Sequence, residues 1–148
     1  MGKERRTLLW GALLVLNLAI IWGNSLVSGA ESGQMSGGIM EVVMNLLRIP
    51  AEYSDTVHLL IRKMAHITEF ACLSALITWC LRRVKEKRVH QILLAVLISM
   101  AVALMDETIQ LRTPDRGPSL VDVWIDTLGA TLGMTAMQLG YHLKKKKT

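Results

Sequence analysis

Aromatic residues are scarce in this chain of 148 residues, where phenylalanine, tyrosine and tryptophan together make up 5%. Proteins that bind single-stranded nucleic acid stack bases on aromatic side chains, and this sequence offers no such platform. The formal net charge of +5 does not indicate nucleic acid either, because the lysines and arginines lie in blocks beside apolar runs. We therefore expect no nucleic-acid partner.

Cysteine is also rare. The two cysteines, Cys72 and Cys80, fall within one predicted helix, where eight residues separate them by roughly 12 Å, too far for a disulfide. We interpret both as packing residues. The sequence also lacks a glycine-rich phosphate loop, a recognised nucleophile motif and a dinucleotide fingerprint. We expect no cofactor, and the sequence leaves open whether the protein is an enzyme.

Apolar residues are abundant, at 51% of the chain, and they are gathered into a few long runs. A bilayer is crossed by about 20 apolar helical residues. We predict one all-α domain over residues 1–148, a polytopic membrane protein built as a four-transmembrane-helix bundle. The predicted spans are about 8–27, 64–81, 91–111 and 120–143.

Two shorter features lie in the first outer segment. Residues 28–38 are rich in glycine and serine, which predicts a loop. The apolar segment at about 36–49 is too short to span, and its polar residues share one face, which predicts a helix at the membrane surface. The first span has a rival interpretation as a secretory signal peptide, with small residues at Ser28 and Ala30. Its length favours a retained anchor.

Three basic blocks predict the topology. They lie at the N-terminus, at Arg82–Arg88 and at Lys144–Lys147. Four spans bring all three blocks to one side, and positively charged segments favour the cytoplasmic side. We therefore expect a plasma-membrane protein whose N- and C-termini are both cytoplasmic. The segments Ser28–Lys63 and Arg112–Ser119 then face outward.

A layer of ionisable residues crosses three of the predicted spans at their outer ends. Arg62, His66 and Glu69 follow one another at four and three residues, so they share one face of a helix. Ionisable groups are costly in hydrocarbon and mark functional sites by default. The third span ends, and the fourth begins, with residues of the same kind: Asp106, Glu107 and Gln110, then Asp122 and Asp126.

We predict that this layer forms an outward-facing polar pocket. The candidates for acid–base chemistry are one histidine and four carboxylates: His66, Glu69, Asp106, Glu107 and Asp126. The candidates for ligand binding are the cations and the remaining polar residues: Arg62, Lys63, Gln110, Arg116 and Asp122. Below the layer, Gly129 and Gly133 continue the stripe of the two fourth-span aspartates and predict close approach of a neighbouring helix.

Two other interpretations of the layer remain open. In the structural one, Arg62, Lys63 and Arg116 neutralise the buried carboxylates and fix the helix register. In the other, one histidine and several carboxylates hold a divalent ion that prefers oxygen ligands. The sequence has neither H-x-x-x-H nor H-E-x-x-H spacing, so we assign no metal ion from the sequence.

The charged layer resembles the VanZ-like family. The matching pattern is Arg62-Lys63-x-x-His66-x-x-Glu69, then Asp106-Glu107-x-x-Gln110, then Arg116 with Asp122-x-x-x-Asp126-x-x-Gly129. The resemblance begins at Asn24-Ser25 and covers most of the chain. It implies a small bacterial membrane protein of a family whose namesake is linked to teicoplanin resistance. This chain has Leu111-Arg112 where the family commonly has an aromatic residue.

Three functions fit these observations. The first is recognition of an anionic envelope lipid or lipid-linked cell-wall precursor, with arginines holding the head group. The second is a small proton-coupled transporter, although the ionisable layer lies on one side only. The third is a non-catalytic adaptor in which the layer is structural.

Overall fold

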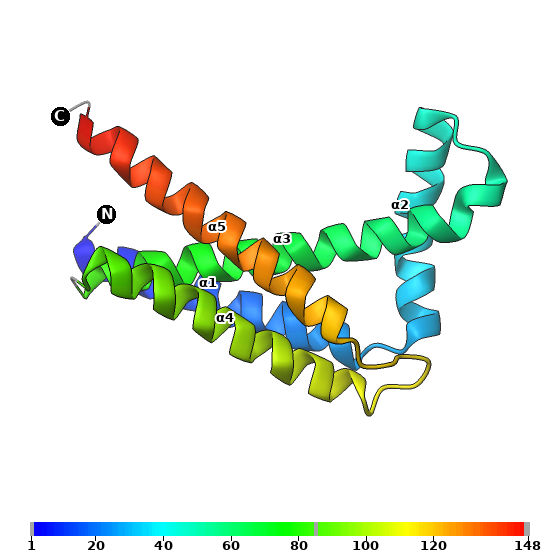
Figure 1. Ribbon diagram of the computed structural model, residues 1–148, viewed down its shortest axis with the longest axis horizontal. Helices are drawn as coiled ribbons and strands as arrows, with labels where there is room; N and C mark the ends of the chain where they lie inside the picture. Colours follow the sequence, from blue (N-terminus) through cyan, green and yellow to red (C-terminus); the bar gives the residue numbers. More distant parts are fainter. Residues whose placement is uncertain (1, 85, 147–148) are drawn as a thin grey trace.

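The computed structural model is all-helical throughout the residues that it describes, 2–84 and 86–146 (Figure 1). The chain forms five α-helices and one short 3₁₀ helix in this part: α1 (Lys3–Leu26), α2 (Gly29–Leu47), η1 (Ala51–Tyr53), α3 (Ser54–Arg83), α4 (Arg88–Gln110) and α5 (Leu120–Lys146).

Three of the described segments are long and apolar enough to cross a membrane. They are Thr7–Leu26, Ala51–Arg83 and Arg88–Gln110. Many of their leucines are exposed, among them Leu8 and Leu97, which suits helices that face lipid. The chain therefore has the helices of a membrane protein. α5 does not belong to this set, and polar side chains on its inner face, including Asp126, reduce its apolar character.

The predicted loop at residues 28–38 is wrong, because α2 already begins at Gly29. Its first turn is fixed by a capping box. The Glu31 N–H donates to Ser28 Oγ at 3.2 Å, and the Ser28 N–H donates to Glu31 Oε2 at 3.3 Å. These bonds satisfy amides that a helix start leaves open, which offsets the low helix propensity of the glycines and serines. The helix predicted at 36–49 corresponds to the C-terminal part of α2, which ends at Leu47, and its place at the membrane surface stays a prediction.

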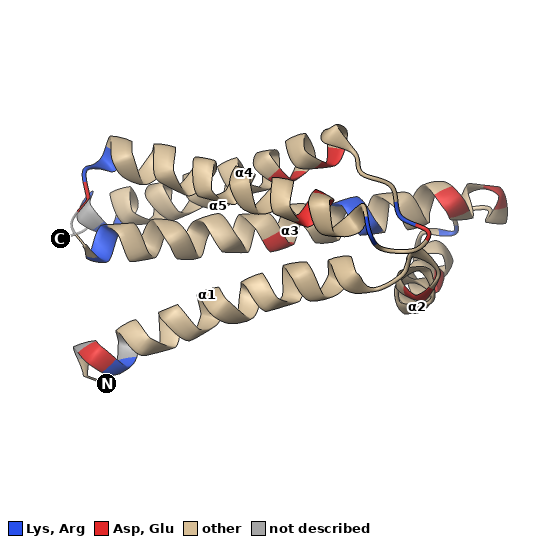
Figure 2. Cartoon of the chain, turned by 90° about the horizontal axis from the view of Figure 1, so that it is seen from below, with Lys and Arg blue, Asp and Glu red and all other residues tan. Residues whose placement is uncertain are grey.

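α1, α3 and α4 lie lengthwise beside one another, α5 runs obliquely across α3, and α2 crosses the other end of α3 (Figure 1). α3 begins at Ser54, well before the predicted start of the second span, and its first turns extend past the bundle to meet α2. The two chain ends and the turn between α3 and α4 lie at one end of the molecule (Figure 2). The basic blocks are therefore at the same end, and α2 is at the other.

α3 and α5 approach each other more closely than side chains on both helices would allow. A Cβ added at Gly129 would lie 2.5 Å from the carbonyl oxygen of Ile67, and one at Gly133 would overlap the backbone of Ala71. Ser74 Oγ donates to the Ala130 carbonyl at 2.5 Å across the same contact. The predicted glycine stripe therefore packs on α3.

The contact predicts different effects for two glycine substitutions in α5. Gly133→Ala should destabilise the protein by about 1–3 kcal/mol, because the new methyl group overpacks the α3 backbone. Gly140→Ala is the matched control, since a Cβ there meets nothing within 4 Å. The control should be neutral or slightly stabilising through helix propensity. Melting temperatures in detergent check this, and equal values for the two variants would contradict the close contact.

Candidate functional site

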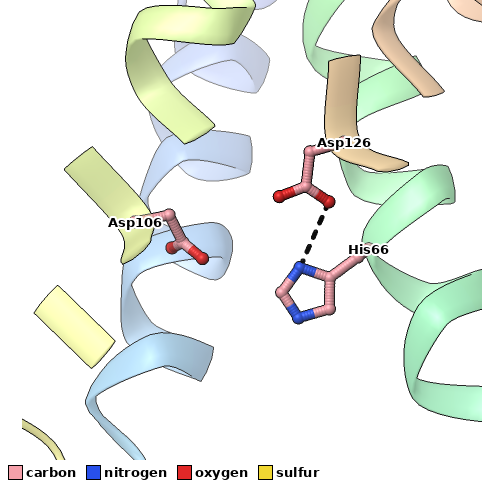
Figure 3. Close-up of side chains that lie close together, drawn as sticks. All are labelled: His66, Asp106 and Asp126. Carbon is pink, nitrogen blue, oxygen red and sulfur yellow. Dashed lines mark ion pairs between the residues drawn. The ribbon is translucent and has the colours of Figure 1, made fainter. Parts of the chain in front are cut away.

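Three helices bring one histidine and two aspartates together inside the bundle (Figure 3). His66 comes from α3, Asp106 from α4 and Asp126 from α5. One ligand-type atom from each residue lies within 4.8 Å of the others, and His66 Nδ1 is 3.4 Å from Asp126 Oδ1. Both aspartates have an exposed fraction of 0%. Residues predicted as one layer from three spans are thus assembled into a buried cluster.

Asp106 is held by two donors. Ser25 Oγ donates to Oδ1 at 2.5 Å, and Gln110 Nε2 donates to Oδ2 at 2.8 Å. Thr113 Oγ1 in turn donates to the Ser25 carbonyl at 2.8 Å, which ties the end of α1 to the segment after α4. Gln110, predicted as a binding residue, is buried and positions the Asp106 carboxylate.

Asp126 is held much less firmly. Neither of its carboxylate oxygens accepts a hydrogen bond from the described residues, and the buried His66 Nδ1 also makes none. The distance of 3.4 Å between them is longer than a charge-assisted hydrogen bond of about 2.7–2.9 Å. Glu69, which was expected to share a helix face with His66, accepts a hydrogen bond from Asn24 Nδ2 at 2.7 Å.

Three other predicted site residues secure the ends of helices. Lys63 forms an ion pair with Asp122, which joins α3 to the first turn of α5. Glu107 Oε2 accepts from the Ser119 N–H at 2.6 Å, just before α5 begins. The Asp122 N–H donates to Ser119 Oγ at 3.3 Å, as expected for a helix cap. These residues therefore fix how α5 starts against α3 and α4.

A pocket of about 260 Å³ lies beside the cluster. Its polar lining includes Arg62, His66, Glu69 and Arg116, and its apolar lining includes Val27, Met35, Ile39 and Ile61. The pocket is bounded by the end of α1, by α2, by α3 and by the segment between α4 and α5. It therefore combines a charged side with an apolar side.

The two arginines of the pocket have no carboxylate partner among the described residues. Arg116 Nε is buried and makes no hydrogen bond there. Burial lowers the pKa of Arg116, and repulsion by the Arg62 charge lowers this pKa further. Both guanidinium groups therefore act on the same space, and neither forms an ion pair with the aspartate cluster among the described residues.

Sequence reasoning missed the contribution of α1 and α2. Asn24 and Ser25 hold Glu69 and Asp106, and Ser32 and Ser36 line the pocket. A signal was present for the first pair, because they are adjacent polar residues at the end of an apolar run. For α2, the signal was the capping-box spacing of Ser28 and Glu31.

Apolar helices that enclose a buried polar cluster define a helical membrane protein with an internal site. The chain belongs to the VanZ/LLP1 family, whose sequence model matches residues 10–141. The match runs from α1 into α5 and so includes every residue of the cluster and of the pocket. No curated protein and no solved structure matches the chain.

Two buried serines provide a test of how Asp106 is held. Ser25→Ala removes a hydrogen bond to a buried carboxylate and should lower the free energy of unfolding by about 1.5–3 kcal/mol. Ser99→Ala is the matched control, because Ser99 is equally buried and its hydroxyl has no partner among the described residues. The control should lower the free energy of unfolding much less. Denaturant titration in mixed micelles measures both, and an unchanged Ser25→Ala would contradict the bond.

Proposed function

We propose that this protein binds an anionic envelope lipid or a lipid-linked cell-wall precursor in the pocket between α1, α2 and α3. The observation that carries the proposal is the pair of arginines, Arg62 and Arg116, which line one pocket without a carboxylate partner among the described residues. Two cations held close together repel each other, so the arrangement gains stability when an anion lies between them.

The chemistry of the pocket fits a phosphate-bearing lipid. Guanidinium groups bind phosphate through two parallel hydrogen bonds, and Arg116 has a buried Nε donor to spare. Met35 and Ile39 of α2 and Ile61 of α3 give the pocket an apolar side that suits the first part of an acyl or prenyl chain. A soluble phosphate metabolite would leave this apolar side without a partner.

His66 is the residue best placed for acid–base chemistry on such a ligand. It lines the pocket, and its Nδ1 faces the carboxylate of Asp126. A histidine at the wall of a pocket is placed to exchange a proton with a bound head group. Glu69 lines the same pocket and is the second candidate. The link of the family's namesake to teicoplanin resistance is consistent with a site for a cell-wall precursor.

We further propose four membrane crossings, with α5 as the fourth. At about 1.5 Å per residue, the 27 residues of α5 are long enough to span the hydrocarbon core. This topology places the basic turn after α3 and both chain ends in the cytoplasm of a bacterial cell. The pocket and α2 then lie toward the outer surface, with α2 at the interface.

The lipid proposal predicts the effect of two arginine substitutions. Arg62→Gln and Arg116→Gln should each reduce the amount of anionic lipid that co-purifies in mild detergent by about tenfold or more, since each removes a charged hydrogen-bond donor. Native mass spectrometry gives the lipid mass and its occupancy.

Arg112→Gln is the matched control for this experiment. Arg112 is an exposed arginine of the same segment as Arg116 and does not line the pocket. The Arg112→Gln variant should retain the lipid. Equal occupancy in the wild type and in both pocket variants would overturn the proposal, as would wild-type protein that binds no lipid from added anionic lipid.

The topology proposal predicts which introduced cysteines react from outside the cell. With Cys72 and Cys80 replaced by serine, Glu41→Cys on α2 should react with a membrane-impermeant maleimide in intact cells, because α2 faces outward. Arg88→Cys at the start of α4 should react only after the membrane is permeabilised. Labelling of Arg88→Cys in intact cells would contradict the topology.

A further inference from the structure

We propose that His66, Asp106 and Asp126 bind a divalent metal ion, with Mn²⁺ or Zn²⁺ as the ions that suit one imidazole and two carboxylates. The proposal goes beyond lipid recognition and does not depend on it. Imidazole is a common ligand of zinc and other late transition ions, whereas carboxylates also suit manganese. Because each ligand comes from a different helix, no short sequence motif indicates the metal site.

The geometry is close to that of an occupied site. One ligand-type atom from each residue lies within 4.8 Å of the others. Metal–ligand bonds of about 2.0–2.2 Å place neighbouring ligand atoms roughly 3–3.5 Å apart. If the two ligand atoms that lie farthest apart each move by roughly 0.7 Å, their separation falls to the value expected around an ion. Small side-chain rotations allow such a movement.

The further evidence for a ligand is the environment of Asp126, whose 3.4 Å contact with His66 Nδ1 is too long for a charge-assisted hydrogen bond. Its side chain is fully buried, and neither carboxylate oxygen accepts a hydrogen bond from the described residues. No lysine or arginine in the described chain pairs with it or with Asp106. An ionised carboxylate in such a place is costly unless a cation or donors compensate it. A divalent ion between His66 and the two aspartates supplies that compensation.

The surroundings also support an occupied site. Ser25 and Gln110 hold both oxygens of Asp106, as outer-shell donors commonly do for carboxylates that bind metal. Three protein ligands leave further positions on the ion open, as in catalytic rather than structural sites. His66 also lines the neighbouring pocket, so an anion held there by the arginines lies beside the ion. The ion would then polarise or orient that anion.

The experiment measures metal binding directly on the full chain in detergent, without lipid. The protein is stripped with a chelator and titrated with MnCl₂ and, separately, with ZnCl₂ by calorimetry. Wild-type protein should bind about one ion per chain, and Asp126→Asn and Asp106→Asn should weaken binding by about tenfold or more. Glu41→Gln removes an exposed carboxylate on α2 and should bind as the wild type does. Wild-type binding by Asp126→Asn, or no binding of either ion by wild-type protein, would overturn the proposal.

A second measurement needs no variant and therefore does not depend on whether the aspartate variants fold. Pulsed electron paramagnetic resonance of wild-type protein with Mn²⁺ should show hyperfine coupling to an imidazole nitrogen, because His66 is the one nitrogen ligand proposed. Mn²⁺ bound without nitrogen coupling indicates surface carboxylates and would overturn the site. Loss of lipid in the arginine variants tests lipid recognition alone, so the two proposals fail separately.

Discussion

The close contact between α3 and α5 is the constraint on which the rest of the structure depends. Two glycines of α5 let its backbone lie against Ile67 and Ala71 of α3. His66 immediately precedes Ile67, and Asp126 lies one turn before Gly129, so the contact that packs the helices also sets the two ionisable side chains face to face. Larger residues at the glycines would separate the helices and move the cluster apart.

The carboxylates of the charged layer are compensated to very different degrees. Asp122 pairs with Lys63, and Asp106 receives two donors. Glu69 receives one donor, from Asn24. Asp126 receives none from the described residues, although it is as fully buried as Asp106. Since burial without compensation is costly, Asp126 is the carboxylate of this group that would gain most from a further partner.

Much of the fold follows from the sequence, because apolar runs of sufficient length predict helices directly. The four long helices and the shared layer of ionisable residues were predicted in this way, and so was the family. The pairing of His66 with Asp126 inside the layer was not predicted. Spacing along one helix relates His66 to Glu69, but the rotation of one helix against another, which joins His66 to Asp126, is set by packing at the glycines. The first turns of α2 were not predicted, because glycine and serine favour loops and only the Ser28–Glu31 cap indicates a helix start there.

The helical structure of α2 changes how strongly the charged layer is able to bind an anion. A flexible loop at this place would leave Arg62 and Arg116 on an open surface, where water screens their charges. As a helix, α2 crosses α3, and Ser36 is hydrogen-bonded to His58 at 2.6 Å, which fixes its position (Figure 1). Its apolar side chains then cover one side of the arginine pair and exclude part of the water. Two cations in a half-enclosed space attract an anion more strongly than the same cations in solvent. The capping box at Ser28 thus contributes to the site without lining it.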